Sequence, residues 1–96
     1  MKIEILEPAI AELSAAAQYY EDHERDLGIE FLAEYENCLN RIASFPKAWG
    51  FASANCRKCL FKRFPYAVIF SFVDESILIV AVMHLSREPL YWAERI

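Results

Sequence analysis

Three side chains near the C-terminus, those of His84, Arg87 and Tyr91, are of the types that cleave RNA without a metal. Such cleavage needs a base for the 2′-hydroxyl proton, a cation for the charge developing on phosphate, and an acid for the leaving 5′-oxygen. Histidine changes charge near neutral pH, arginine binds phosphate bidentately, and tyrosine stacks on a base or donates a proton. Further positive charge comes from a basic segment earlier in the chain: Lys58, Lys62 and Arg63.

The same residues also have structural interpretations. His84 follows an apolar run, where a histidine can be packed and hydrogen-bonded, and Arg87 can pair with Glu88 or bond strand-end carbonyls. Tyr91 and Trp92 can anchor the tail on the core through their apolar bodies. The basic segment can solvate an edge strand and discourage aggregation. Residue types alone therefore leave both interpretations open.

Other constellations carry weaker signals. Cys56 and Cys59 form a C-x-x-C pair, but a structural zinc site needs four ligands and no second pair exists. A redox dithiol normally lies at a helix N-terminus, whereas this pair leads into an expected strand. Ser86 lacks a nucleophile elbow, and Gly28 and Gly50 alone cannot build a glycine-rich phosphate loop. We therefore expect no metal and no cofactor.

The composition predicts one domain, residues 1–96, with a single core. The chain is 56% hydrophobic, which excludes disordered and collagen-like classes and predicts an exposed groove that a partner covers. The net charge of −4 is unevenly distributed, because residues 1–48 hold four Lys/Arg and ten Asp/Glu whereas residues 49–96 hold six and four. This balance argues against general nucleic-acid coating but permits a local basic patch.

The sequence shows no sign of a targeting or membrane segment. Glu4 and Glu7 interrupt the N-terminal region where a signal peptide would be apolar. The longest apolar runs, such as Ile77–Met83, are far shorter than the roughly 20 residues of a membrane helix. An odd number of cysteines fits a reducing compartment. We expect a cytoplasmic protein with no membrane contact.

Hydrophobic periodicity predicts one strand followed by two helices. Lys2–Leu6 alternates as a strand does, and a helix is expected from Pro8 to about Asp26, ended by a left-handed C-cap at Gly28. Its expected solvent side carries acidic residues: Glu12, Glu21, Asp22 and Glu24. The second helix has an apolar stripe that ends before Pro46: Phe31, Tyr35, Cys38, Ile42 and Phe45. The short connection predicts an antiparallel helical hairpin.

The remaining chain changes to a strand pattern after a loop, 47–56. Strands are expected at Arg57–Phe64, Tyr66–Val73 and Ile77–His84, with a hairpin turn at Asp74-Glu75 and one helical turn after Pro89. Runs that are apolar on both faces predict a sheet covered by helices on one side and partly covered on the other. The fold class is α+β, in the order β-α-α-β-β-β, with an antiparallel meander and the first strand beside it.

Four segments, taken in order, resemble a known family: "AELSAAAQYYED", "LGIEFLAEYENCLNRIASFP", "RFPY" and "HLSREPLYW". The chain is similar to RelE/ParE-type toxins of bacterial type II toxin–antitoxin systems, often called plasmid stabilisation proteins. The resemblance spans nearly the whole chain and implies the α+β fold described above. It also implies a protein that blocks growth and is neutralised by a cognate antitoxin. RelE-like members cleave mRNA on the ribosome, whereas ParE-like members poison DNA gyrase.

One position favours the ParE-like branch. Ribonuclease members of the family typically carry an arginine early in the third strand, and aligning "YAVIF" puts Ala67 there. Alanine cannot bind phosphate, and an acidic pI of 5.1 fits poorly with docking on ribosomal RNA. We therefore expect a toxin that binds a protein target, DNA gyrase. Since Arg63 can substitute from the neighbouring strand, a ribosome-dependent endoribonuclease stays an alternative.

The resemblance also assigns expected roles to individual residues. Under the nuclease alternative the catalytic residues are His84, Arg87, Arg63 and Tyr91. Target contacts are expected from a mainly basic set: Arg87, Lys58, Lys62, Arg63 and Trp92. The antitoxin is expected to contact the helical hairpin at Tyr20, Phe31 and Tyr35, forming a hetero-oligomer. A third alternative is a non-toxic binding module or co-repressor that acts with its antitoxin.

Overall fold

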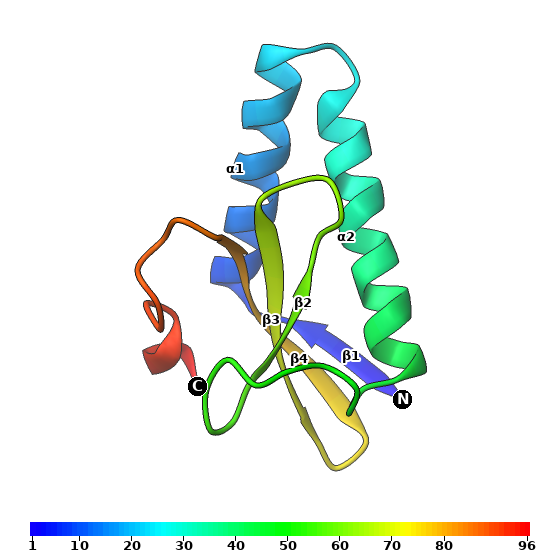
Figure 1. Ribbon diagram of the computed structural model, residues 1–96, viewed down its shortest axis with the longest axis vertical. Helices are drawn as coiled ribbons and strands as arrows, with labels where there is room; N and C mark the ends of the chain where they lie inside the picture. Colours follow the sequence, from blue (N-terminus) through cyan, green and yellow to red (C-terminus); the bar gives the residue numbers. More distant parts are fainter.

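The computed structural model describes residues 1–96 as a helical hairpin packed on a four-stranded sheet (Figure 1). The elements in chain order are β1 (Lys2–Ile5), α1 (Glu7–His23), α2 (Leu27–Ser44), β2 (Arg57–Leu60), β3 (Tyr66–Val73), β4 (Ser76–His84) and the 3₁₀ helix η1 (Ala93–Arg95). The strand order is β1-β4-β3-β2, with β1 parallel to β4 and the other neighbours antiparallel. The predicted α+β class and the place of the first strand beside a meander are confirmed.

The turn between the helices differs from the prediction in its glycine. α1 ends at His23, and the left-handed residue of the turn is Asp26, with φ 68°, whereas Gly28 lies inside the first turn of α2. The carboxylate of Glu21 accepts hydrogen bonds from the backbone N–H groups of Asp26 and Gly28, both at 3.0 Å. A Cβ atom on Gly28 would lie 2.5 Å from the carbonyl oxygen of Ala17. The glycine is therefore required for the close approach of the two helices, not for a C-cap.

The main core lies between the helices and the sheet. The buried stripe of α2 consists of Phe31, Tyr35, Cys38 and Ile42, as its spacing predicted, while Phe45 is exposed beyond the helix end. The stripe packs on side chains from the helix-facing side of the sheet: Cys59, Val68, Phe70, Ile77, Ile79 and Val82. This packing orients both helices on one face, with the turn between them far from the β3–β4 hairpin (Figure 1).

A second, smaller core covers the opposite face of the sheet. Trp92 from the C-terminal tail is 2% exposed and packs with Cys56 from the loop before β2. Their sheet partners are Ala67, Ile69, Val80 and Ala81. The loop and the tail are therefore the partial cover that the apolar runs predicted for this face.

The strands at the edges and turns show two local departures from ideal pairing. β2 ends at Leu60 and not at Phe64, because the carboxylate of Glu34 on α2 accepts bonds from the backbone N–H groups of Lys62 and Arg63 and holds a loop there. In β4, Val80 is an extra residue, since Ile69 pairs with Ala81 and Phe70 with Ile79.

The β3–β4 connection is the expected hairpin turn. Asp74 and Glu75 both have positive φ, 52° and 61°, which matches the twist of a two-residue hairpin. None of the helices has the length and apolar character that crossing a membrane requires.

Candidate functional site

His84 and Arg87 line one pocket at the end of β4. The pocket has a volume of 290 Å³, and its other polar side chains are Glu12 and Tyr19 from α1 and Tyr66 from the start of β3. Tyr66 pairs with His84 across the strands, and their rings meet edge to face at 5.0 Å. The structure therefore brings together two of the residues expected for RNA cleavage, along with two tyrosines that sequence analysis did not select.

The hydrogen bonds of His84 fix its protonation pattern. Its Nδ1 atom accepts a bond of 3.0 Å from the backbone N–H of Ser86 and lies 2.8 Å from the Ser86 hydroxyl. A backbone N–H can only donate, so the neutral ring carries its proton on Nε2. In this arrangement neither ring nitrogen has a free lone pair with which to take a substrate proton.

Tyr91 is engaged in a buried bond and not available as an acid. Its hydroxyl donates to Glu12 at 2.6 Å. Burial, together with this bond and the Glu12 charge, raises the pKa of Tyr91 well above its ordinary value. The Arg87 guanidinium stacks on the Tyr91 ring, 3.8 Å from the ring centre, and Arg87 is exposed. Arg87 is therefore a free cation held in place by an aromatic ring.

Glu12 and Arg95 complete a cluster that sequence analysis missed. The Arg95 guanidinium donates to both carboxylate oxygens of Glu12, at 2.9 and 3.0 Å. The pairing of β1 with β4 ends at Ile79. Beyond that residue, side chains bond the backbone of β4: Glu12 accepts a hydrogen bond from the Val82 N–H, and Arg95 donates one to the Val80 carbonyl. We call Glu12, Tyr91 and Arg95 the tail clamp, because they tie the C-terminal tail to α1 and β4.

The tail clamp also sets the charge state of its carboxyl group. Burial alone would raise the pKa of Glu12, but hydrogen bonds from Arg95, Tyr91 and the Val82 amide outweigh it and hold the pKa below its ordinary value. The same pairing raises the pKa of Arg95. Glu12 had been placed on the solvent side of its helix from periodicity; it faces the tail instead.

Ala67, the position that separates the two branches of the family resemblance, is 1% exposed in the second core. It packs with Trp92 and Cys56 beneath the loop and the tail. An arginine side chain at this position would meet apolar atoms and have no acidic partner among them.

The basic segment after β2 does not enter the His84 pocket. Arg63 forms a salt bridge with Glu30 on α2 and lines a different pocket with Tyr20 and Glu24. Lys62 is exposed in the same loop, and Lys58 is exposed on β2. The proposed substitution of Arg63 for the missing strand arginine is therefore not supported by the geometry.

Three of the aromatic residues expected to contact a partner are buried instead. Phe31 and Tyr35 belong to the main core, so they are not part of an exposed surface in this conformation, and their contact with an antitoxin stays a prediction. Trp92 is buried in the second core, where it packs the tail on the sheet, so it is not an exposed contact in this conformation. Tyr20 is half-buried and stacks on Phe31 with ring centres 5.4 Å apart. Apolar spacing alone does not separate core from surface.

The exposed apolar residues of the hairpin lie beside the buried stripe. A groove of 390 Å³ runs between α1 and α2, lined by Leu13, Ala17, Gly28, Ile29 and Leu32 among others. Ile29 is 65% exposed and Leu32 is 41% exposed. We call this feature the hairpin groove.

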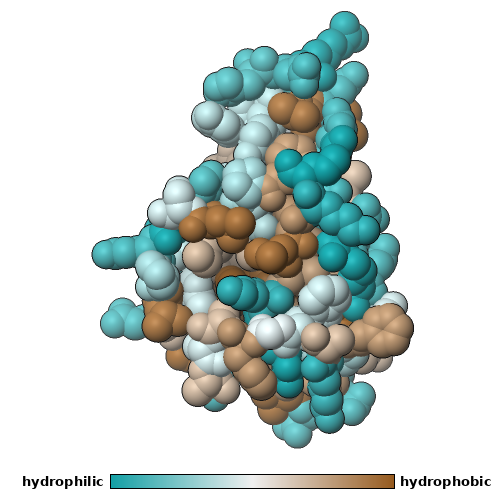
Figure 2. All heavy atoms as spheres, in the orientation of Figure 1, coloured by the Kyte–Doolittle hydropathy of each residue, from teal (hydrophilic) through white to brown (hydrophobic).

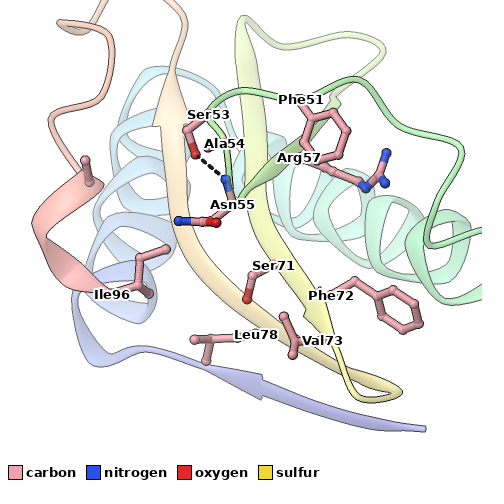
Figure 3. A pocket seen from close by; sticks show the side chains of 11 residues that line it. Phe51, Ser53, Ala54, Asn55, Arg57, Ser71, Phe72, Val73, Leu78 and Ile96 are labelled. Carbon is pink, nitrogen blue, oxygen red and sulfur yellow. Dashed lines mark hydrogen bonds between the residues drawn. The ribbon is translucent and has the colours of Figure 1, made fainter.

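A larger hollow of 660 Å³ lies over the second face of the sheet (Figure 3). Its apolar lining includes Phe51 from the loop, Val73 and Leu78 from the sheet, and Ile96 from the tail. On the face shown in Figure 2, hydrophobic residues gather over the lower, sheet half of the molecule, while the end of the helical hairpin is hydrophilic. The protein thus exposes apolar surface in two separate places.

The C-x-x-C motif does not form one site. Cys56 belongs to the second core, and Cys59 belongs to the main core on the opposite face of the sheet. No group of three or more His, Cys, Asp or Glu side chains is placed to hold a metal ion.

Comparison with known proteins identifies the family. Residues 3–89 match the model of the ParE toxin of the type II toxin–antitoxin system, parDE. The chain belongs to the ParE toxin family. A solved structure described as the chromosomal ParDE TA system from P. aeruginosa matches with a TM-score of 0.65 and 16% identity, covering 90% of this chain and 97% of that one. At that identity the match supports the fold alone. A search of curated protein sequences found no significant match.

For a ParE-family toxin, the site residues predicted from sequence divide into three groups. His84 and Arg87 share a pocket, whereas Arg63 and the lysines lie outside it. Tyr91 supports Arg87 through its ring and the tail through its hydroxyl. The predicted aromatic contacts are mostly core, and the exposed apolar surface comes from aliphatic residues of the hairpin groove.

Proposed function

We propose that this ParE-family protein is a growth-inhibiting toxin that binds DNA gyrase and has no hydrolytic site of its own. The observation that carries the proposal is that two of the expected catalytic residues, His84 and Tyr91, are engaged in hydrogen bonds within the chain. His84 has no free lone pair, Tyr91 donates to Glu12, and Ala67 is buried where a nuclease of the wider family would carry an arginine. Among the expected site residues, Arg87 is an exposed cation that is free to contact a target.

Arg87 is the residue that we propose for direct target contact. Its guanidinium has no acidic partner within salt-bridge distance and rests on the Tyr91 ring. Lys62 and Arg63 lie in the loop that precedes β3, at the same end of the sheet, since the N–H of Leu85 donates to the carbonyl of Pro65. A cationic surface of this kind suits an acidic protein surface through complementary charge.

The proposal for Arg87 is tested by growth inhibition after induced expression. Arg87→Ala should weaken inhibition at equal protein level, because it removes a surface cation without touching the core. Arg25→Ala, an exposed arginine at the turn of the helical hairpin, is the matched control and should leave inhibition intact. Equal inhibition by both variants would show that Arg87 does not contact the target.

An endoribonuclease is the second candidate, and one observation favours it. The 290 Å³ pocket places His84 and Arg87 beside Tyr66 and Tyr19, which are the side-chain types for RNA cleavage. Against it, the Nδ1 atom of His84 accepts from the backbone N–H of Ser86 and is not free to act as a base. Under this candidate His84→Ala abolishes toxicity, whereas under gyrase binding it leaves toxicity largely unchanged.

Pulse labelling of DNA, RNA and protein synthesis after induction separates the candidates. Gyrase poisoning should stop DNA synthesis first, because replication depends on supercoiling. Arrest of protein synthesis first would support mRNA cleavage instead. Normal synthesis of all three polymers would support the third candidate, a non-toxic binding module or co-repressor.

We further propose that a cognate antitoxin neutralises the toxin by laying an amphipathic segment in the hairpin groove. The groove is open, apolar and flanked by the acidic side chain of Glu21, so an apolar segment with basic flanks suits it. Ile29→Glu should abolish antitoxin binding and leave toxicity intact, because Ile29 lies outside the core. Val73→Glu, equally apolar and 62% exposed but outside the hairpin groove, is the matched control. Unchanged antitoxin binding by Ile29→Glu would place the interface elsewhere.

A further inference from the structure

We infer that Cys38 and Cys59 form an oxidation site at which hydrogen peroxide joins α2 to the edge strand β2 through an intramolecular disulfide. The inference does not depend on the proposed function. It concerns a pair of thiols that the C-x-x-C motif does not reveal, since Cys38 lies 21 residues before Cys59 and on a different element.

The geometry brings the two cysteines together across the helix–sheet interface. Cys38 is on the buried stripe of α2, and its Sγ atom lies 4.0 Å from the carbonyl oxygen of Cys59 and 3.8 Å from that of Leu60. The side chains of both cysteines belong to the main core between α2 and the sheet. Both residues are fully buried, and both are free thiols.

A cation without an acidic partner lies against this pair. Nη2 of Arg41 is 3.2 Å from the Cys38 sulfur and 3.2 Å from the Leu60 carbonyl oxygen, and its Nε is buried with no hydrogen-bond partner. Glu34 on α2 is bonded to two backbone N–H groups of the β2–β3 loop. A guanidinium in this position favours a thiolate beside it.

The Arg41 charge acts on both sulfurs. It lowers the pKa of Cys38 and of Cys59, whereas burial raises both. Because the guanidinium touches the Cys38 sulfur directly, it supports a thiolate at this pair, and either sulfur can attack the oxidant first.

The reaction balances with peroxide as the oxidant. The thiolate of one cysteine attacks one oxygen of hydrogen peroxide, forming an S–O bond and breaking the O–O bond, and the departing hydroxide is protonated to water. The thiol of the other cysteine then attacks the sulfur of the sulfenic acid, forming the S–S bond and releasing the oxygen, which leaves as water with the proton of that thiol. Two thiols lose two electrons in total, and one peroxide becomes two waters.

Cys38 and Cys59 lie near the edge of the sheet, where a small oxidant can reach them. β2 is a four-residue edge strand whose outer side is covered at one end by a single bridge between Phe51 and Arg57, and at the other by the Arg41 side chain. Local opening of a short edge strand needs less free energy than global unfolding. Bulky oxidants need a larger opening, which makes hydrogen peroxide the suitable class of reagent.

The disulfide would cross-link the C-terminal half of α2 to β2 and close the loop between them. A bond that closes about 20 residues restricts the unfolded chain, so Tm should rise on the order of 10 °C. The cross-link would also hold the free edge of β2 at Leu60, which is half exposed, against α2.

The test treats the full-length folded protein with a small excess of hydrogen peroxide and maps disulfides by mass spectrometry of a non-reduced digest. The expected result is a peptide pair linking Cys38 to Cys59, a higher Tm, and the return of both thiols on treatment with dithiothreitol. Cys56→Ser, which leaves the pair intact, should give the same result. Cys59→Ser should give no linked peptide and no rise in Tm.

Wild-type mapping decides the question even if Cys59→Ser does not fold. A bond between Cys56 and Cys59, a disulfide between two chains, or oxidation of Cys56 alone would each overturn the inference. Two free thiols at Cys38 and Cys59 after peroxide treatment of the folded protein would overturn it as well.

Discussion

Replacing Glu12 with alanine should unfold the C-terminal tail and destabilise the whole domain. Glu12 accepts four hydrogen bonds: two from the Arg95 guanidinium, one from the Tyr91 hydroxyl and one from the Val82 N–H. The substitution leaves all of these donors without their partner. Because Trp92 lies between Tyr91 and Arg95 in sequence, loss of the tail clamp also loosens the second core.

The size of the effect follows from how far the pair is buried. The side chains of Glu12 and Arg95 are 16% and 21% exposed, so solvent screens the charges only in part. Breaking a buried pair by removing one partner costs roughly 3–5 kcal/mol, and the residual exposure places this case at about 3 kcal/mol. That is a large share of the roughly 5–15 kcal/mol that holds a small domain folded, and for a chain this size it lowers Tm by roughly 12–24 °C.

Thermal and urea unfolding, followed by circular dichroism and tryptophan fluorescence, measure this effect. Glu12→Gln, which keeps an acceptor but removes the charge, should lose about half as much stability. Glu36→Ala removes an exposed carboxylate on α2 and should stay within about 0.5 kcal/mol of the wild type. If Glu12→Ala is as stable as Glu36→Ala, the tail clamp does not stabilise the fold and the reasoning is wrong.

The pH dependence of the wild type checks the same cluster. The folded pKa of Glu12 lies below its ordinary value of 4.5, so the folded state binds fewer protons than the unfolded state around that pH. The contribution of the carboxylate is therefore fully present above pH 4.5 and is lost as the pH falls through the folded pKa. The difference in the free energy of unfolding between wild type and Glu12→Gln should shrink as the pH falls below 4.5; a difference that grows would contradict the assignment.

Three further substitutions test the packing. Gly28→Ala should destabilise by roughly 2 kcal/mol, because the new Cβ would lie 2.5 Å from the Ala17 carbonyl oxygen, whereas Gly50→Ala meets nothing within 4 Å and should be neutral in urea unfolding. Trp92→Ala should cost roughly 3–5 kcal/mol in the same assay, and a loss below 1 kcal/mol would argue against a packed tail. Ala67→Arg should fail to give a native near-ultraviolet spectrum, because the guanidinium would be buried among apolar side chains; a stable, folded variant would reopen that position to phosphate binding.

The secondary structure was predictable because its signals are local. The α2 stripe has helical spacing along its whole length, and the apolar runs of β3 and β4 are bounded by turn residues. The Asp74-Glu75 turn likewise rests on residue types that suit a hairpin. Helix and strand periods therefore sufficed for the element order and the fold class.

Local signals failed where contacts between elements decide the structure. Gly28 was expected to end the first helix, but its small size serves the approach of α1 and α2. Phe31 and Tyr35 were expected at a surface, because a stripe does not show which of its members the sheet will cover. β2 is shorter than its pattern because Glu34, on another element, captures the loop amides.

In the candidate site, too, local features were predictable from the sequence and contacts between distant residues were not. The proximity of His84 and Arg87 follows from their short separation in sequence. The tail clamp joins Glu12 to Arg95 across 83 residues, and no periodic pattern links a helix residue to a tail residue. Cys38 and Cys59 were similarly hidden, because the only visible cysteine motif pairs Cys59 with a residue on the opposite face of the sheet.

The most direct test of the proposed function is a supercoiling assay with purified DNA gyrase and the purified toxin. The account predicts inhibition of supercoiling with accumulation of cleaved DNA, weakened by Arg87→Ala and unaffected by Arg25→Ala. Full gyrase activity at a large excess of folded toxin, together with mRNA cleavage on ribosomes that His84→Ala abolishes, would contradict it.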